Sequence, residues 1–201
     1  MKTELCEYFF KYSSDKCPQI AHSYSPHYYD LFKDFKYQYE NILEIGIGNN
    51  ELMKPLYGEN YVIGGSLKAF RDFFKNAKIY GLDIREDVLF TEERIQCFYT
   101  DQSSSEELHK TINNIKKINN KDDLTFDLII DDGSHIVEHM KLSFEVLGNQ
   151  YLKVGGLYII EDIKRKDLDI FSKLGSPNFE IIKTHMGNSP QDDFIAYKKI
   201  K

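Results

Sequence analysis

Two acids and two histidines follow a run of mostly apolar residues in the segment FDLIIDDGSHIVEH, which spans 126–139. Asp131 and Asp132 end the run, His135 follows three residues later, and His139 lies four residues further on. Carboxylates bind hard divalent cations, and a histidine near its usual pKa can accept a proton at neutral pH. The segment therefore has the residue types of a metal-assisted acid–base site, although DDG alone could form a plain turn and a single histidine is more often structural.

A second pair of acids, Glu161 and Asp162, ends another apolar run, LYIIEDI. Taken alone, such a pair could cap a helix. In open α/β folds, ligands bind beyond the carboxyl ends of the strands. We therefore expect Asp132, Glu161 and Asp162 to face His135 across two adjacent strand ends.

Two glycines follow the first apolar run, in NILEIGIGNN. Gly46 and Gly48 allow a sharp turn and a close approach of the backbone to a ligand. The spacing does not fit a dinucleotide fingerprint, because the third glycine position is Glu51 and the next strand-end acid, Asp83, comes 35 residues after Gly48 instead of about 20. This spacing disfavours NAD. Glu44 is unusual inside an apolar strand, since a buried carboxylate needs hydrogen-bond donors or a cation.

Acids also end the next two predicted strands. Asp83 ends IYGLDI and could accept both hydroxyls of a ribose, or be a surface acid or a helix cap. Asp101 in FYTDQSS could accept an adenine amino group, or serve as an N-cap.

Short apolar runs alternate with longer amphipathic stretches along most of the chain, which is typical of βαβ units. We expect parallel strands at 41–47, 78–84, 95–101, 126–131 and 157–163, and helices at 66–76, 103–119 and 136–152. The last of these helices would place His139 one turn after His135 on the same face. Two strands at 179–186 and 193–200 would form a hairpin.

The predicted fold is α/β, with a doubly wound, mostly parallel, seven-stranded Rossmann-like sheet that ends in a C-terminal antiparallel hairpin. Residues 1–40 do not fit the alternation and are rich in aromatic side chains. We expect them to form a helical or lid segment beside a domain over 41–201. Within this segment, His22, Tyr24, Tyr28 and Tyr29 would suit a lid that faces a sugar, or the ordinary packing of a helix.

Composition limits the classes of function. The chain has 201 residues, which suits one domain, and a net charge of −6, which argues against nucleic acid as a partner. Cys6, Cys17 and Cys97 form no metal-binding or disulfide pattern, which is typical of a reducing compartment. With neither a signal peptide nor an apolar run of membrane-spanning length, we expect a cytoplasmic protein without a membrane partner.

Taken together, the strand ends resemble a known family. NILEIGIG, YGLDI and YTDQS resemble the S-adenosylmethionine sites of class I methyltransferases. DDGSH followed by GGLYIIEDI narrows the resemblance to the macrocin and mycinamicin sugar O-methyltransferases, with cephalosporin-hydroxylase-like proteins as relatives. The resemblance covers 41–163 and extends more weakly to SSDK and HSYSPHYYDLF, where Gly-Thr-Asp-Lys would be commoner than Ser13–Lys16.

The resemblance implies an S-adenosylmethionine-dependent methyltransferase, and it assigns roles to residues of this chain. Mg²⁺ or a similar divalent cation would be bound by Asp132, Glu161 and Asp162. His135 would be the general base, and His139 would assist it or contact the substrate. The cofactor would be bound by Glu44, Gly46, Gly48, Asp83, Asp101, Gln102 and Asp131.

The implied acceptor is a hydroxyl of a sugar or of a glycosylated small molecule, such as a nucleotide-sugar. The chain is short for a macrolide-sugar enzyme, which leaves the acceptor open, and a homo-oligomer is left open as well. Two alternatives remain at this point. One is methyl transfer to a phosphate-like or nitrogen acceptor, and the other is a non-catalytic cofactor-binding or hydroxylase-like partner protein.

Overall fold

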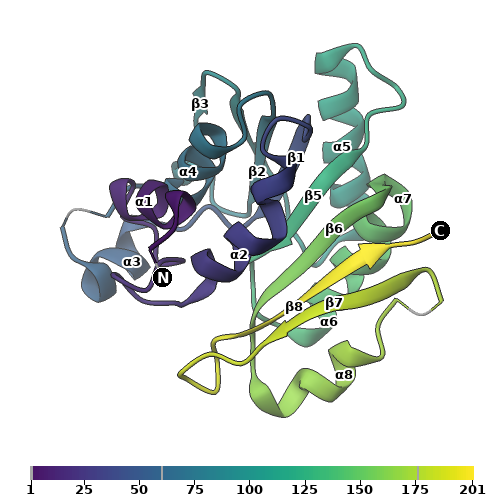
Figure 1. Cartoon of the computed structure of the whole chain (residues 1–201). Helices are drawn as coiled ribbons and strands as arrows, with labels where there is room; N and C mark the ends of the chain where they lie inside the picture. The colour runs from purple at the N-terminus through teal and green to yellow at the C-terminus, as the bar shows by residue number, and fades with distance from the viewer. Residues whose placement is uncertain (1, 60, 176) are drawn as a thin grey trace.

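A computed structural model describes residues 2–59, 61–175 and 177–201, and its centre is one twisted sheet (Figure 1). Within the described residues the sheet has eight strands in the order β3-β4-β2-β1-β5-β6-β8-β7. The strands are β1 (Asn41–Ile45), β2 (Lys78–Asp83), β3 (Thr91–Glu92), β4 (Ile95–Tyr99), β5 (Phe126–Asp131), β6 (Leu152–Ile163), β7 (Phe179–His185) and β8 (Asp193–Lys199).

The pairing confirms the predicted mostly parallel sheet with a C-terminal hairpin. Strands β4, β2, β1, β5 and β6 run parallel to their neighbours in this row, whereas β8 pairs antiparallel with both β6 and β7. The strand count differs from the predicted seven because β3 has two residues, too few to give a periodic signal in the sequence.

Two apolar clusters sandwich the sheet, one on each face. In β6, for example, Leu157 and Ile159 belong to the first cluster, and Tyr158 and Ile160 to the second. This alternation is the two-residue period of a strand that is buried on both faces. Helices α1 (Glu4–Lys11), α2 (Tyr24–Phe32) and α4 (Gly65–Phe73) cover the first face, whereas α5 (Ser105–Asn119), α6 (Val137–Ser143), α7 (Asn149–Tyr151) and α8 (Leu168–Ser172) lie on the second.

The remaining short elements are η1 (Lys33–Phe35), α3 (Asn50–Tyr57), η2 (Glu86–Val88), η3 (Phe144–Gly148) and η4 (Arg165–Asp167). Helix α5 matches its prediction closely, because the Ser104 hydroxyl accepts a hydrogen bond from the Glu107 backbone N–H at 3.2 Å and caps the helix. No helix in the described parts of the chain is long and apolar enough to cross a membrane.

The predicted helix over 136–152 is wrong in detail. It is divided into α6, the π-helical turn η3 and α7, and β6 already begins at Leu152. Since α6 begins at Val137, His135 lies in the loop before the helix and does not share a helix face with His139. The glycines at 155 and 156, which follow the predicted helix directly, lie inside β6.

Candidate active site

A cavity of about 270 Å³ opens at the carboxyl ends of β1, β2 and β4. The parallel pairing of these strands brings together residues that are far apart in the sequence. Six of its lining residues are Gly46, Asp83, Asp101, Gln102, Ser134 and His139.

The two acids of this cavity are held by backbone groups nearby. Asp83 accepts hydrogen bonds from the backbone N–H groups of Ile47 at 2.8 Å and Arg85 at 2.9 Å, and so fixes the loop after β1. Asp101 accepts hydrogen bonds from the hydroxyl and the backbone N–H of Ser103, which lower the pKa of the Asp101 carboxyl. Both carboxylates are therefore preoriented at the cavity edge.

The two glycines after β1 have conformations that other residues avoid. Gly46 has a φ of 91°, and a Cβ atom there would lie 2.0 Å from the backbone oxygen of Asp132. Gly48 has a φ of 75°, and a Cβ atom there would lie 2.1 Å from the Tyr61 hydroxyl. Both glycines line a small hollow of about 30 Å³ that also touches Asp132, and Gly46 is shared with the larger cavity. The turn thus brings the backbone close to both spaces.

Asp131, expected at the cofactor, lies behind the cavity wall. It is fully buried and accepts hydrogen bonds from Gln102 Nε2 at 2.6 Å and from the Ser143 hydroxyl. Burial raises the pKa of the Asp131 carboxyl to about 6. Gln102 in turn accepts a hydrogen bond from the Ser134 backbone N–H at 3.0 Å. Asp131 therefore orients Gln102, and Gln102 reaches the cavity.

Beside the hollow, three carboxylates surround one buried lysine. Lys16 Nζ lies 2.5 Å from Asp132 Oδ2, 2.5 Å from Glu161 Oε2 and 3.4 Å from Glu44 Oε1. Burial opposes the positive charge, but these carboxylates outweigh it and raise the pKa of the Lys16 ammonium well above its usual range. The site is thus built around a positive charge.

Lys16 is the main residue that the sequence reasoning missed. Two signals pointed to it: a buried Glu44 needs hydrogen-bond donors or a cation, and the SSDK stretch is part of the weaker resemblance. Glu44 itself is fully buried and pairs with Lys16 and with the Ser66 hydroxyl at 2.8 Å. Burial raises the pKa of Glu44 to about 7. Glu44 therefore lies beneath the cofactor side of the site, and Ser66 lines the hollow in its place.

Two tyrosines of α2, one turn apart, reach the acids at the end of β6. The Tyr24 hydroxyl donates a hydrogen bond to Asp162, and the Tyr28 hydroxyl donates one to Glu161. Both tyrosines are fully buried, which favours the second of the two alternatives for them, the packing of a helix. Tyr29 packs its ring against Phe73 in the same apolar cluster.

Asp132, His135 and Asp162 converge at the ends of β5 and β6. One ligand atom from each lies within 4.8 Å of the other two. His135 Nε2 is 3.9 Å from Asp162 Oδ2. His135 and Asp162 have φ values of 54° and 50°, a left-handed conformation that is uncommon for these residue types and recurs at functional sites. Burial raises the pKa of the Asp162 carboxyl.

The remaining two predicted site residues are placed differently. Glu161 is 1% exposed, with its oxygens taken by Lys16 and Tyr28, and it is not part of the converging group. His139 Nδ1 lies 3.1 Å from the Ser134 hydroxyl, and His139 lines the larger cavity and is not part of the group of Asp132, His135 and Asp162. His139 therefore lies at the larger cavity, whereas His135 lies with Asp132 and Asp162.

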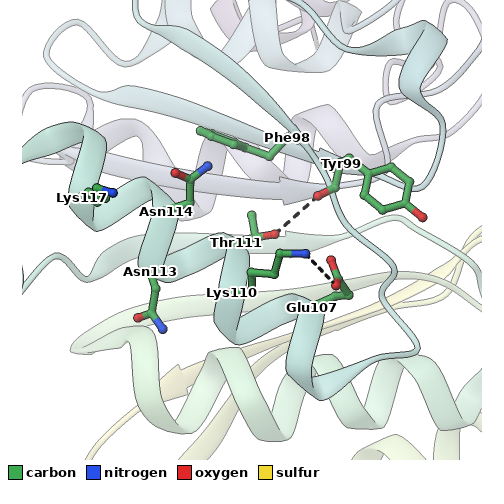
Figure 2. Close-up of a pocket in the computed structure, with 8 residues that line it drawn as sticks. All are labelled: Phe98, Tyr99, Glu107, Lys110, Thr111, Asn113, Asn114 and Lys117. Atoms are coloured by element: carbon green, nitrogen blue, oxygen red, sulfur yellow. Dashed lines mark hydrogen bonds and ion pairs between the residues drawn. The ribbon is translucent and has the colours of Figure 1, made fainter.

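A separate hollow of about 570 Å³ lies between α5 and the last residues of β4 (Figure 2). In this hollow, Lys110 pairs with Glu107 at 3.0 Å, and Thr111 donates to the Tyr99 carbonyl at 3.4 Å. No described acid or histidine converges there as it does at β5 and β6, so we place the functional site at the strand ends.

No protein-family model matches the chain, but curated proteins and solved structures do. The chain is 36% identical over 162 residues to a mycinamicin VI 2''-O-methyltransferase from Micromonospora griseorubida, covering 81% of this chain and 36% of that protein. It is 35% identical to a demethylmacrocin O-methyltransferase from Streptomyces fradiae, covering 81% and 37%. The chain thus spans about a third of the length of these relatives.

Solved structures show the same similarity. MycE methyltransferase from the mycinamycin pathway, in complex with Mg and SAH, has a TM-score of 0.69 and 27% identity, over 100% of this chain and 55% of that one. An O-methyltransferase from Bacillus cereus in complex with SAH has a TM-score of 0.56 at 15% identity, over 99% of this chain and 92% of that one, which shows the fold alone.

Proposed function

Since this chain is homologous to the macrocin and mycinamicin sugar O-methyltransferases and has the class I methyltransferase fold, we propose that it is an S-adenosylmethionine-dependent O-methyltransferase. Its acceptor is a hydroxyl of a sugar or glycosylated small molecule. One observation carries the proposal: a cavity for a nucleoside and a carboxylate–histidine group share a wall at Gly46 and Asp132. A methyl donor and an activated hydroxyl need this proximity to react.

The cofactor would lie across both spaces. Asp83 is placed to accept the ribose hydroxyls and Asp101 an adenine amino group, since both carboxylates are fixed at the cavity edge. Gln102 and Ser134 line the same cavity as these two carboxylates. The amino-acid end would approach the backbone turn at Gly46 and Gly48, beside the small hollow. S-adenosylhomocysteine would bind in the same place.

The residues at β5 and β6 fit a divalent cation. Carboxylate oxygens are the preferred ligands of Mg²⁺, and Asp132 and Asp162 present them within 4.8 Å of each other. The neighbouring Lys16 ammonium indicates that this environment favours positive charge. We propose that Asp132 and Asp162 bind the cation. Glu161, expected as a third ligand, instead holds Lys16 and Tyr28 in position.

His135 is the proposed general base. A sugar hydroxyl is a poor nucleophile until its proton leaves, and neutral imidazole at the mouth of the site can accept that proton. The hydroxyl oxygen then forms a bond to the methyl carbon as the carbon–sulfur bond breaks, and the proton remains on His135. A bound divalent cation supplies positive charge that stabilises the developing oxyanion. His139 lies on the cofactor side and contributes to that wall.

The direct test is a methyl-transfer assay with labelled S-adenosylmethionine against a panel of nucleotide-sugars and glycosides. We expect the labelled methyl group to appear as a methyl ether on a hydroxyl of at least one acceptor. Methyl transfer should be lost in excess chelator and recovered when Mg²⁺ is added. If the methyl group is transferred only to a phosphate-like or nitrogen acceptor, the proposed hydroxyl acceptor is wrong and that acceptor takes its place. Binding of S-adenosylhomocysteine without transfer to any acceptor would favour the non-catalytic alternative.

A further inference from the structure

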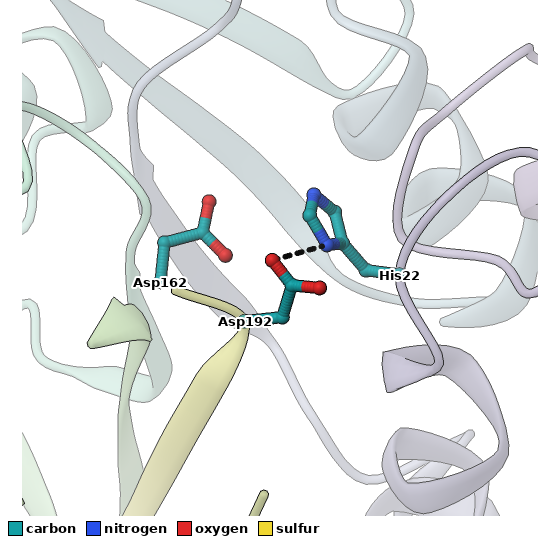
Figure 3. A group of neighbouring side chains, drawn as sticks. All are labelled: His22, Asp162 and Asp192. Carbon is teal, nitrogen blue, oxygen red and sulfur yellow. Dashed lines mark ion pairs between the residues drawn. The ribbon is translucent and has the colours of Figure 1, made fainter. Parts of the chain in front are cut away.

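A second group of possible ligands shares Asp162 with the first (Figure 3). His22, Asp162 and Asp192 each place one ligand atom within 4.8 Å of the other two. They come from three separate elements: His22 precedes α2, Asp162 lies near the end of β6, and Asp192 directly precedes β8. In Figure 3 the Asp162 and Asp192 carboxylates and the His22 ring point toward one another.

The contact between His22 and Asp192 is too long for a hydrogen bond. His22 Nδ1 lies 3.5 Å from Asp192 Oδ1, beyond the usual range of N–H···O bonds. Nδ1 is buried and has no hydrogen-bond partner among the described residues. A buried polar atom without a partner costs free energy. Two ligands of one cation, each about 2.1 Å from the ion, lie about 3–4 Å apart, so this spacing suits a shared cation.

The His22 ring is held in the orientation that a metal ligand needs. It stacks on Tyr24 with ring centroids 5.0 Å apart and an interplanar angle of 11°. Its other nitrogen, Nε2, faces Asp15 Oδ2 at 3.9 Å. A histidine that binds a metal through one nitrogen commonly has a carboxylate near the other. His22 thus has a free nitrogen toward Asp192 and an orienting acid behind it.

We propose that His22, Asp162 and Asp192 bind a divalent cation of their own, in addition to the one proposed at Asp132 and Asp162. One imidazole and two carboxylates suit Mn²⁺ or Zn²⁺ better than Mg²⁺, which prefers oxygen ligands alone. Asp162 would then bridge two cations, as carboxylates do in two-metal sites. The second cation would connect the segment before α2, the end of β6 and the loop before β8.

The test is a titration of the whole chain, freed of metal by chelator, with Mn²⁺ as the probe and electron paramagnetic resonance to count bound ions. We expect two Mn²⁺ per wild-type chain and one in each of His22→Ala and Asp192→Asn. Asp122→Asn, an exposed acid of a distant loop, is the matched control and should bind two. S-adenosylhomocysteine affinity, measured by calorimetry on each variant, checks that the fold is intact.

Other outcomes separate this proposal from the proposed function. One Mn²⁺ in wild type that is lost in Asp132→Asn but kept in His22→Ala and Asp192→Asn overturns the second site and leaves the first intact. One Mn²⁺ that is lost in His22→Ala and Asp192→Asn but kept in Asp132→Asn supports this site and removes the metal from the proposed function. If His22→Ala does not fold, Asp192→Asn decides, because it changes one carboxylate in a partly exposed loop. Two Mn²⁺ bound by Asp192→Asn would overturn the second site.

Discussion

The two halves of the proposed site are held in different ways. On the cofactor side, Asp83 and Asp101 are fixed mainly by backbone groups of the loops at the ends of β1, β2 and β4. On the acid side, Asp132, Glu161 and Asp162 are held by Lys16, Tyr24 and Tyr28, more than 110 positions earlier in the chain. Asp83 and Asp101 therefore depend on loops at the strand ends, whereas the three acids at β5 and β6 depend on how residues 2–40 dock.

This difference predicts that the two halves can be disabled separately. Changes on the acid side should alter chemistry, cation binding or stability while leaving cofactor affinity nearly intact. Changes on the cofactor side should do the reverse.

The largest effect is expected for His135→Ala. Loss of a general base should lower kcat by about 10²–10⁴, and S-adenosylhomocysteine affinity should stay close to wild type because His135 does not line the cofactor cavity. His139→Ala is the matched comparison, and it should cost much less in kcat because His139 is not part of the group of Asp132, His135 and Asp162. Steady-state kinetics and calorimetry measure both. If His139→Ala is inactive and His135→Ala remains active, then His139 is the general base and His135 is not.

Lys16→Met should destabilise the fold more than any other single change on the acid side. Removing one partner of a buried ion pair leaves uncompensated charge and costs about 3–5 kcal/mol, here spread over Glu44, Asp132 and Glu161. Denaturant unfolding measures the loss, and added Mg²⁺ should recover part of it by replacing the missing positive charge. Lys110→Met, on an exposed face of α5, should change stability by less than about 0.5 kcal/mol.

Lys110→Met guards against a general effect of losing a lysine. Equal losses in the two variants would mean that Lys16 has no special role. Stability of Lys16→Met that does not respond to Mg²⁺ would mean that the cation does not enter the carboxylate cluster.

Asp83→Ala tests the cofactor side alone. The loss of a charged hydrogen-bond acceptor should weaken S-adenosylhomocysteine binding by about 1–3 kcal/mol, while Mg²⁺ affinity stays unchanged. Asp87→Ala, an acid on the exposed turn after β2, is the control and should leave both affinities near wild type. Calorimetry with each ligand gives the answer, and a Mg²⁺ affinity that falls together with cofactor affinity would contradict the division into two halves.

Tyr24→Phe and Tyr28→Phe should have smaller effects. Each removes one hydroxyl that donates to Asp162 or Glu161 and keeps the buried ring. We expect Mg²⁺ affinity to weaken by about 0.5–1.5 kcal/mol per hydrogen bond without a change in S-adenosylhomocysteine affinity. Tyr29→Phe, which leaves the ring contact with Phe73 in place, is the control. Unchanged Mg²⁺ affinity in both variants would mean that the two tyrosine hydroxyls do not help to bind the cation and that the side chains only pack in the core.

The same division explains what could be predicted from sequence. The parallel strands are short apolar runs with strong local signals, and Asp83, Asp101, Asp132 and Asp162 could be found because strand ends meet at one edge. Lys16 and the tyrosines could not be placed, because their roles depend on the docking of α2, which no local pattern encodes. The sequence could not show that Asp131 lies behind the cavity wall, because adjacent acids at a strand end look alike, nor that Glu44 pairs with Lys16, because the partner lies 28 positions earlier in the chain.

The smallest expected effect concerns the contact of α2 with β7. Helix α2 carries Tyr24 and Tyr28, which bond to the acids at the end of β6. His185 packs against His27 with ring centroids 4.2 Å apart, and its Nε2 lies 3.0 Å from the Ser23 hydroxyl. Burial, together with the charges of His27 and Lys183, lowers the pKa of His185 to about 4. The folded state therefore prefers neutral His185. Its contribution to stability is complete above the unfolded pKa of about 6.5 and is lost as the pH falls toward 4.

His185→Gln removes this titration and keeps a polar side chain. Between pH 7 and pH 4.5 the Tm of the wild type should fall by a degree or two more than the Tm of the variant, because only the wild type must charge a disfavoured imidazole. Asp131, whose pKa is raised by burial, acts in the opposite direction in both proteins and cancels in the comparison. Parallel Tm curves would mean that His185 is free to protonate. A steeper fall in the variant would mean that protonated His185 holds α2 in place.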